Sequence, residues 1–148
     1  MSSNELQTIR AFVESQSTLA LATVDAKGHP QAAPLFYVSD EALNLYWLSS
    51  PTSRHSVNLT AREHVAATIY AAVWSWLEIR GLQIEGMANA VTDEATRETI
   101  LTRYRQKFDL PAAFDAPIAA STLYRLTPRW MRWLDNGVRF GYKREIQI

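Results

Sequence analysis

The sequence predicts a mainly β protein with helices (α+β). We expect a six- to seven-stranded antiparallel split barrel of Greek-key type, flanked by helices. Three observations predict it. Short apolar runs follow one another with turn clusters between them, which indicates consecutive hairpins. A long amphipathic segment comes late in the chain. There is no GxGxxG motif, which disfavours a βαβ dinucleotide-binding fold. The 148 residues, 47% of them hydrophobic, are sufficient for one domain with a core.

The first element is predicted to be a helix over residues 4–16. Asn4 is a plausible N-cap, and Leu6, Ile9 and Val13 share one helical face.

Three strands are expected next, over residues 17–24, 31–38 and 43–50. The turn sequences DAKGHP and SDEA join them, and such short connections indicate an antiparallel meander. Pro34 lacks a backbone N–H, so the second strand should lie at a sheet edge or carry a bulge.

A short helix near residues 54–61 and a strand over 64–70 follow. Segment 71–78 is ambiguous, because Trp74 and Trp76 can pack either inward or against a partner.

The longest predicted strand covers residues 78–91, where Gly81 and Gly86 indicate bulges or the close approach of another group. A helix over 92–108 is expected to be capped by Thr92. Its apolar stripe consists of Ile100, Tyr104 and Phe108.

The remaining chain is predicted to hold a connector rich in proline and alanine over 109–121. Two last strands, 121–128 and 129–135, would be joined by a tight TPR turn before the polar-aromatic tail.

Composition excludes several classes of function. Fifteen basic residues balance fifteen acidic ones, which argues against a nucleic-acid binder. The absence of cysteine excludes disulfides, thiol nucleophiles and cysteine-based metal sites. We expect neither a secretory signal nor a membrane span, and therefore a cytoplasmic protein without a membrane partner.

The stretch SSPTSRHSVNL, residues 49–59, has two interpretations. The start of a helix favours an anion, hydroxyls donate hydrogen bonds, and an arginine fork suits phosphate oxygens. The candidate phosphate ligands are Ser49, Ser50, Thr52, Ser53, Arg54 and His55. The alternative is an ordinary serine-capped helix with a solvated arginine, which the spacing alone favours.

Other chemistries find little support. His29, His55 and His64 share no metal-ligand spacing, and no GxSxG elbow is present. Glu78 and Glu85 are an odd number of positions apart on a predicted strand, so they face opposite sides and form no carboxylate pair. We therefore assign no metal ligand and no catalytic side chain.

Three segments in order carry a resemblance: LALATVDAKGHPQAAPLFYV, LNLYWLSSPTSRHSVNL and WLEIRGLQIEGMANAV. Together they resemble the pyridoxamine 5′-phosphate oxidase-like, FMN-binding split-barrel family, in particular its small bacterial branch. The likeness covers roughly residues 17–91 and, more weakly, 123–136.

The resemblance implies a set of cofactor-binding residues. Ser53, Arg54 and His55 match the family's turn that grips the FMN phosphate, and the backbone of two strands would line the flavin ring. Arg80 and Gly81 match a contribution made from the second subunit, and Trp133 matches an aromatic near the flavin. The set is Ala33, Pro34, Leu35, Phe36, Trp47, Leu48, Ser49, Ser53, Arg54, His55, Arg80, Gly81 and Trp133.

The resemblance further implies a homodimer with FMN at the interface and two-electron redox chemistry on a small organic substrate. The chain departs from the oxidase by carrying His55 where the family has lysine. It also lacks the basic residues and the Arg-x-His pair used on pyridoxamine phosphate. An alternative is a non-catalytic protein that binds or senses flavin, haem or a deazaflavin.

Overall fold

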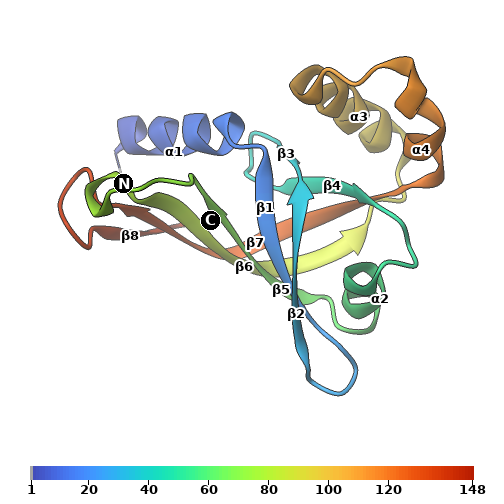
Figure 1. Cartoon of the computed structure of the whole chain (residues 1–148), viewed down its shortest axis with the longest axis horizontal. Helices are drawn as coiled ribbons and strands as arrows, with labels where there is room; N and C mark the ends of the chain where they lie inside the picture. The colour runs from blue at the N-terminus through green and yellow to red at the C-terminus, as the bar shows by residue number, and fades with distance from the viewer. Residues whose placement is uncertain (1) are drawn as a thin grey trace.

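The computed structural model describes residues 2–148, which form a strongly curled antiparallel sheet with helices around it (Figure 1). The strands are β1 Thr18–Val24, β2 Pro30–Phe36, β3 Val38–Ser39, β4 Leu45–Ser49, β5 His64–Tyr70, β6 Arg80–Ala90, β7 Thr122–Asp135 and β8 Lys143–Ile146. The helices are α1 Ser3–Ser15, α2 Arg54–Ala61, α3 Glu94–Phe108 and α4 Asp115–Ala120, with 3-10 turns η1 Trp76–Glu78 and η2 Ala112–Phe114.

The sheet has the strand order β2-β1-β5-β6-β7-β4-β3, and β8 adds to β7. This eight-stranded arrangement, including the two-residue strand β3, confirms the predicted α+β split-barrel class.

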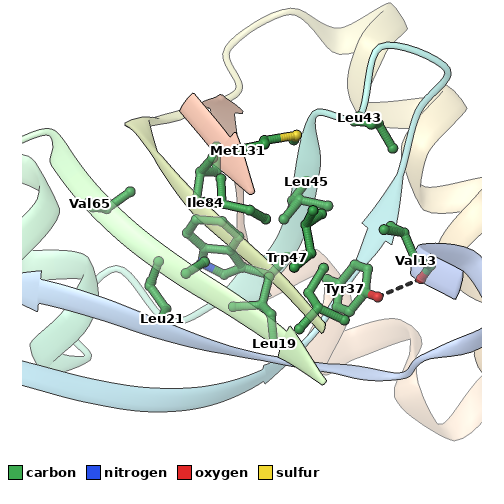
Figure 2. Packing of buried hydrophobic residues seen from close by; sticks show 14 of the residues in the cluster. Val13, Leu19, Leu21, Tyr37, Leu43, Leu45, Trp47, Val65, Ile84 and Met131 are labelled. Atoms are coloured by element: carbon green, nitrogen blue, oxygen red, sulfur yellow. Dashed lines mark hydrogen bonds between the residues drawn. The ribbon is translucent and has the colours of Figure 1, made fainter. Parts of the chain in front are cut away.

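The barrel is split between β2 and β4. The predicted meander is therefore wrong at this point: β1 pairs with β2 and β3 with β4, but no pairing joins β2 to β4 within residues 2–148. The chain changes direction at Tyr37, which is fully buried between β2 and β3. Its backbone N–H donates to the Ser17 carbonyl at 3.2 Å, and its hydroxyl donates to the Val13 carbonyl (Figure 2). These bonds fix the point from which the two strand edges diverge.

The core lies inside the curl and is closed at one end by α1. Ile9, Phe12 and Val13 are the buried residues of α1, and the ring of Phe12 meets Trp133 edge-on at 5.1 Å. Trp47 and other apolar side chains of the strands fill the interior (Figure 2). Helix α2 contacts β1 elsewhere, where Asn58 donates to the buried Thr23 hydroxyl at 3.1 Å.

The two predicted C-terminal strands are one continuous strand, β7. The predicted TPR turn is instead a bulge: Gly86 pairs with Pro128 and Glu85 with Trp130, so Arg129 is an extra residue. Pairing with β4 ends at Leu126 and pairing with β8 begins at Met131. Pro128 therefore sits where β7 has a neighbour on one side only, and there its missing N–H is tolerated.

Several local details also differ from the predictions. Ser2, rather than Asn4, caps α1, and Asp93, rather than Thr92, caps α3; each side-chain oxygen accepts a hydrogen bond from a backbone N–H three residues on. The connector over 109–121 holds η2 and α4, and the tail contains β8. Segment 71–79 is largely irregular, and Trp74 and Trp76 are exposed rather than buried.

The predicted roles of one proline and two glycines are confirmed. Pro34 lies on the edge strand β2. A Cβ on Gly81 would lie 3.0 Å from the Ile69 carbonyl oxygen, and one on Gly86 would overlap the Thr127 carbonyl. Backbones thus approach closely at both glycines, and the approach is closest at the bulge.

We expect Gly86→Ala to lower the free energy of unfolding by about 3 kcal/mol, because the clashing atom belongs to the backbone of β7. Gly28→Ala is the matched control: its φ of +87° is strained for alanine, but no atom lies within 4 Å, so its cost should be about 1 kcal/mol. Urea denaturation of both variants measures the difference. Equal losses would contradict the role given to Gly86.

Helix α3 holds a lysine in an unfavourable position. The Lys107 ammonium has no hydrogen-bond partner among the described residues and lies 4.1 Å from the Tyr37 ring centroid. Burial lowers the pKa of Lys107 to about 8. The loss of hydration therefore outweighs the attraction of the Glu14 carboxylate, which raises the pKa.

We expect Lys107→Met to raise the free energy of unfolding at pH 7, by about 0.5 kcal/mol. The folded-state pKa lies below the unfolded value, so between them the unfolded chain holds a proton that the folded chain lacks. The contribution of Lys107 to the wild-type free energy of unfolding therefore rises from pH 8 upward. The difference in this free energy between Lys107→Met and the wild type should shrink toward pH 10. Denaturation at both pH values tests this, and a variant less stable at pH 7 would contradict it.

Candidate functional site

Loop 50–53 and the start of α2 form a hydroxyl-rich corner at the end of β4. The Ser53 hydroxyl donates to the Ser50 carbonyl at 2.8 Å and lies 2.7 Å from the Ser56 hydroxyl. The Ser50 and Thr52 hydroxyls are 2.9 Å apart. Although Ser53 occupies the N-cap position, its side chain makes no capping hydrogen bond. The alternative interpretation is thus wrong about the capping hydrogen bond and right about the solvated arginine, because Arg54 is exposed. Without a side-chain cap, the first-turn N–H groups are free of a Ser53 contact.

His55 links this corner to β4. Its Nε2 atom is 2.6 Å from the Ser49 hydroxyl and 3.2 Å from the Ser53 hydroxyl. Burial lowers the pKa of His55, so the ring is neutral at neutral pH. His55 therefore orients two hydroxyls and adds no positive charge at that pH.

Arg54 supplies the positive charge of the corner. It is the first residue of α2, and its side chain is exposed. No ion pair of Arg54 is found within residues 2–148, so its guanidinium can turn toward an anion at the helix start.

Two unpaired backbone edges extend from the corner. Within the described chain, Trp47, Leu48 and Ser49 pair only with β7, and Ala33–Phe36 pair only with β1. The split thus offers backbone N–H and C=O groups from β2 and β4. Side chains at this edge are partly polar and partly apolar, with Leu35 and Leu48 half-buried.

The predicted aromatic walls behave differently from one another. The side chains of Trp47 and Trp133 are almost completely buried in the core, so in a single chain neither has surface to offer a ligand. Phe36 is 53% exposed and stacks on Phe108 of α3, with ring centroids 4.7 Å apart. Phe108 was predicted only as part of a helix stripe, and nothing in its spacing indicated this contact.

Arg80 and Gly81 are not brought together with the hydroxyl-rich corner in one chain. They begin β6, beside the end of β7 and below α1. The Arg80 Nε donates to the buried Asp135 at 3.1 Å. Any contribution of these residues to the corner would have to come from another copy of the chain.

The outer face of the sheet carries an apolar groove that the sequence analysis missed. Its volume is about 400 Å³, and small side chains of β1, β2 and β5 form its floor, with Trp130 of β7 beside them. The small residues whose side chains face outward are Ala20, Ala22, Ala32 and Ala66. The alternation of alanine with leucine in β1 was the available signal, since alternate residues of a strand face opposite sides.

The histidines do not gather. His29 lies in a turn beside Asp25, with 3.2 Å between Nδ1 and Oδ2, and His64 is exposed at the start of β5. Within residues 2–148 no three His, Asp or Glu side chains are placed to share a metal ion. No helix in this range is long and apolar enough to cross a bilayer.

The fold is a split antiparallel barrel with a hydroxyl-rich corner at the end of β4. The family model described as pyridoxamine 5′-phosphate oxidase matches residues 6–135. The chain therefore belongs to the pyridoxamine 5′-phosphate oxidase family, as the resemblance implied.

Individual relatives are more distant. A UPF0306 protein of Enterobacter sp. (strain 638) is 26% identical over 112 residues, covering 76% of this chain and 75% of that protein. The haem storage protein HutZ of Vibrio cholerae is similar in fold, with a TM-score of 0.71, 22% identity, and 83% and 89% of the two chains covered. A conserved hypothetical protein of Mycobacterium tuberculosis gives a TM-score of 0.77 at 21% identity, with coverages of 91% and 85%.

Proposed function

We propose that the chain is an FMN-binding flavoprotein and that the corner at Ser53 and Arg54 holds the FMN phosphate. One observation carries this proposal. An N-cap serine leaves the start of α2 uncapped, while hydroxyls and an exposed arginine surround it. A dianion satisfies these donors together, whereas a purely structural turn would use Ser53 to cap the helix.

The chemistry of the surrounding donors fits the rest of FMN. The flat ring needs an apolar wall and a few backbone hydrogen bonds, and the unpaired edges of β2 and β4 offer both. Ala33–Phe36 and Trp47–Ser49 would contribute through their backbone. Phe36, supported by Phe108, is the aromatic side chain with surface available.

When bound, the flavin would supply two-electron redox chemistry toward a small organic substrate. The residues of this chain would bind and orient it. Ser53 and Arg54 would fix the phosphate, and neutral His55 would hold the Ser49 and Ser53 hydroxyls in place. Pyridoxamine phosphate is not favoured as the substrate, because the basic residues and the Arg-x-His pair are missing from the sequence.

We also propose a homodimer, formed through the outer face of the sheet. The alanine-floored groove is mostly apolar, although Gln83 and Glu85 also line it, and Tyr70, at the end of β5, is 59% exposed. An uncovered apolar sheet face of this kind is commonly buried by a second copy. A partner seated there would bring further residues, among them the backbone at Gly81, toward the cofactor.

A haem-binding role is the second candidate. It is favoured by the fold similarity to HutZ, whose name describes haem storage, and by His64, an exposed imidazole on the strand that helps line the groove. In such a protein the groove, rather than the corner at Ser53, would be occupied.

We expect Arg54→Ala to weaken FMN binding about 10- to 100-fold, because a charge-assisted fork to the phosphate is lost. Arg10→Ala, an exposed substitution on α1, is the matched control and should bind FMN as the wild type does. Fluorescence titration of FMN measures both affinities, and circular dichroism checks the fold.

Unchanged FMN affinity in Arg54→Ala would remove the phosphate assignment. A Soret band on titration with hemin, without quenching of FMN fluorescence, would favour the haem candidate instead. Bound FMN that no electron donor reduces would favour storage or sensing over catalysis.

We expect Ala22→Glu to shift the protein from dimer to monomer, because two copies would bury a charge against an apolar face. Ala26→Glu introduces the same side chain in the exposed turn after β1 and should leave the dimer intact. Sedimentation equilibrium measures the dissociation constant. A dimer that tolerates Ala22→Glu would show that this face is not the interface.

A further inference from the structure

Arg80 is fixed in place by contacts that leave part of its guanidinium uncommitted. Its Nε donates to Asp135 Oδ2 at 3.1 Å, and Asp135 Oδ1 accepts from the Gly137 N–H at 2.9 Å. The guanidinium carbon lies 5.8 Å from the centre of the Phe12 ring and 5.4 Å from that of Trp133. Asp135 is 7% exposed, whereas the Arg80 side chain is 39% exposed. The arginine is therefore preorganised, with terminal nitrogens that can still donate.

This arginine borders a cleft between α1 and the segment that precedes β6. The cleft has a volume of about 650 Å³. Phe12, Ala71 and Val73 give it apolar walls, while Gln16 and Glu78 add polar groups. The cleft therefore combines a cation, an anion and an apolar surface within one small volume.

The charges around the cleft select among small ligands. Arg80, Asp135 and Glu78 together carry a net charge of −1, so a phosphate or a simple carboxylate would gain little on entering. A zwitterion matches the set better. Its carboxylate can accept hydrogen bonds from the Arg80 guanidinium, and its ammonium can donate to the Glu78 carboxylate.

We propose that this cleft is a binding site for an apolar α-amino acid. The carboxylate lies against Arg80, the ammonium against Glu78, and the side chain against Phe12, Ala71 and Val73. Within one chain the cleft shares no residue with the corner at Ser53, so leucine binding can be measured on the FMN-free protein.

The test uses L-leucine and two derivatives that each remove one charge. N-acetyl-L-leucine lacks the ammonium, and L-leucinamide lacks the carboxylate. NMR titration of the ¹⁵N-labelled protein should show saturable shifts with leucine at Thr8 and Ala71, which line the cleft. Each derivative should bind at least about tenfold more weakly, since each loses a charge-assisted contact.

Glu78→Gln should weaken leucine binding about tenfold while leaving the affinity for N-acetyl-L-leucine unchanged. Arg80→Lys keeps a cation for Asp135 but loses the fork, and should weaken leucine and N-acetyl-L-leucine alike. Glu98→Gln, an exposed substitution on α3, is the control and should bind leucine normally. The dispersion of each ¹⁵N spectrum verifies folding.

Two results would overturn the proposal. One is the absence of saturable shifts in the wild-type protein up to about 10 mM leucine, which corresponds to an affinity too weak for a built site. The other is leucine binding that Glu78→Gln leaves unchanged, because the ammonium would then not be recognised.

Discussion

The close approach of Gly86 to the Thr127 carbonyl is the contact on which the shape of the barrel depends. It sits at the bulge where β7 gains Arg129, and a bulge bends its strand. Because of this bend, one half of β7 pairs with β4 and the other half with β8, while β6 follows along its whole length. A side chain at position 86 would separate these backbones and disturb both halves of the sheet.

The candidate site follows from how the curled sheet ends. Because the chain turns away at Tyr37, β2 and β4 leave their facing edges unpaired, and α2 begins directly beyond one of them. The hydroxyl-rich corner and the free strand edges therefore lie next to each other. The neutral His55 fits this arrangement, since a permanent charge at its half-buried position would cost solvation.

Most strands and the fold class were predictable because alternating apolar residues and turn clusters are local signals. The hydroxyl corner was predictable for the same reason, as it is contiguous in sequence. What failed depended on distant partners. Pro128, in the supposed TPR turn, is accommodated because the pairing of β7 with β4 ends before it and the pairing with β8 begins after it. The unpaired split between β2 and β4 depends on the burial of Tyr37 against α1. Likewise, nothing near Arg80 in sequence indicates that it pairs with Asp135.

The edge strand β2 has a consequence for how the protein behaves at high concentration. An exposed strand edge is a template on which other chains can add and grow into aggregates. Within the described chain β2 pairs only with β1, so its other edge is free. Pro30 and Pro34 remove two of the N–H groups that an added strand would use. The edge thus resists the continuous ladder that a fibril requires.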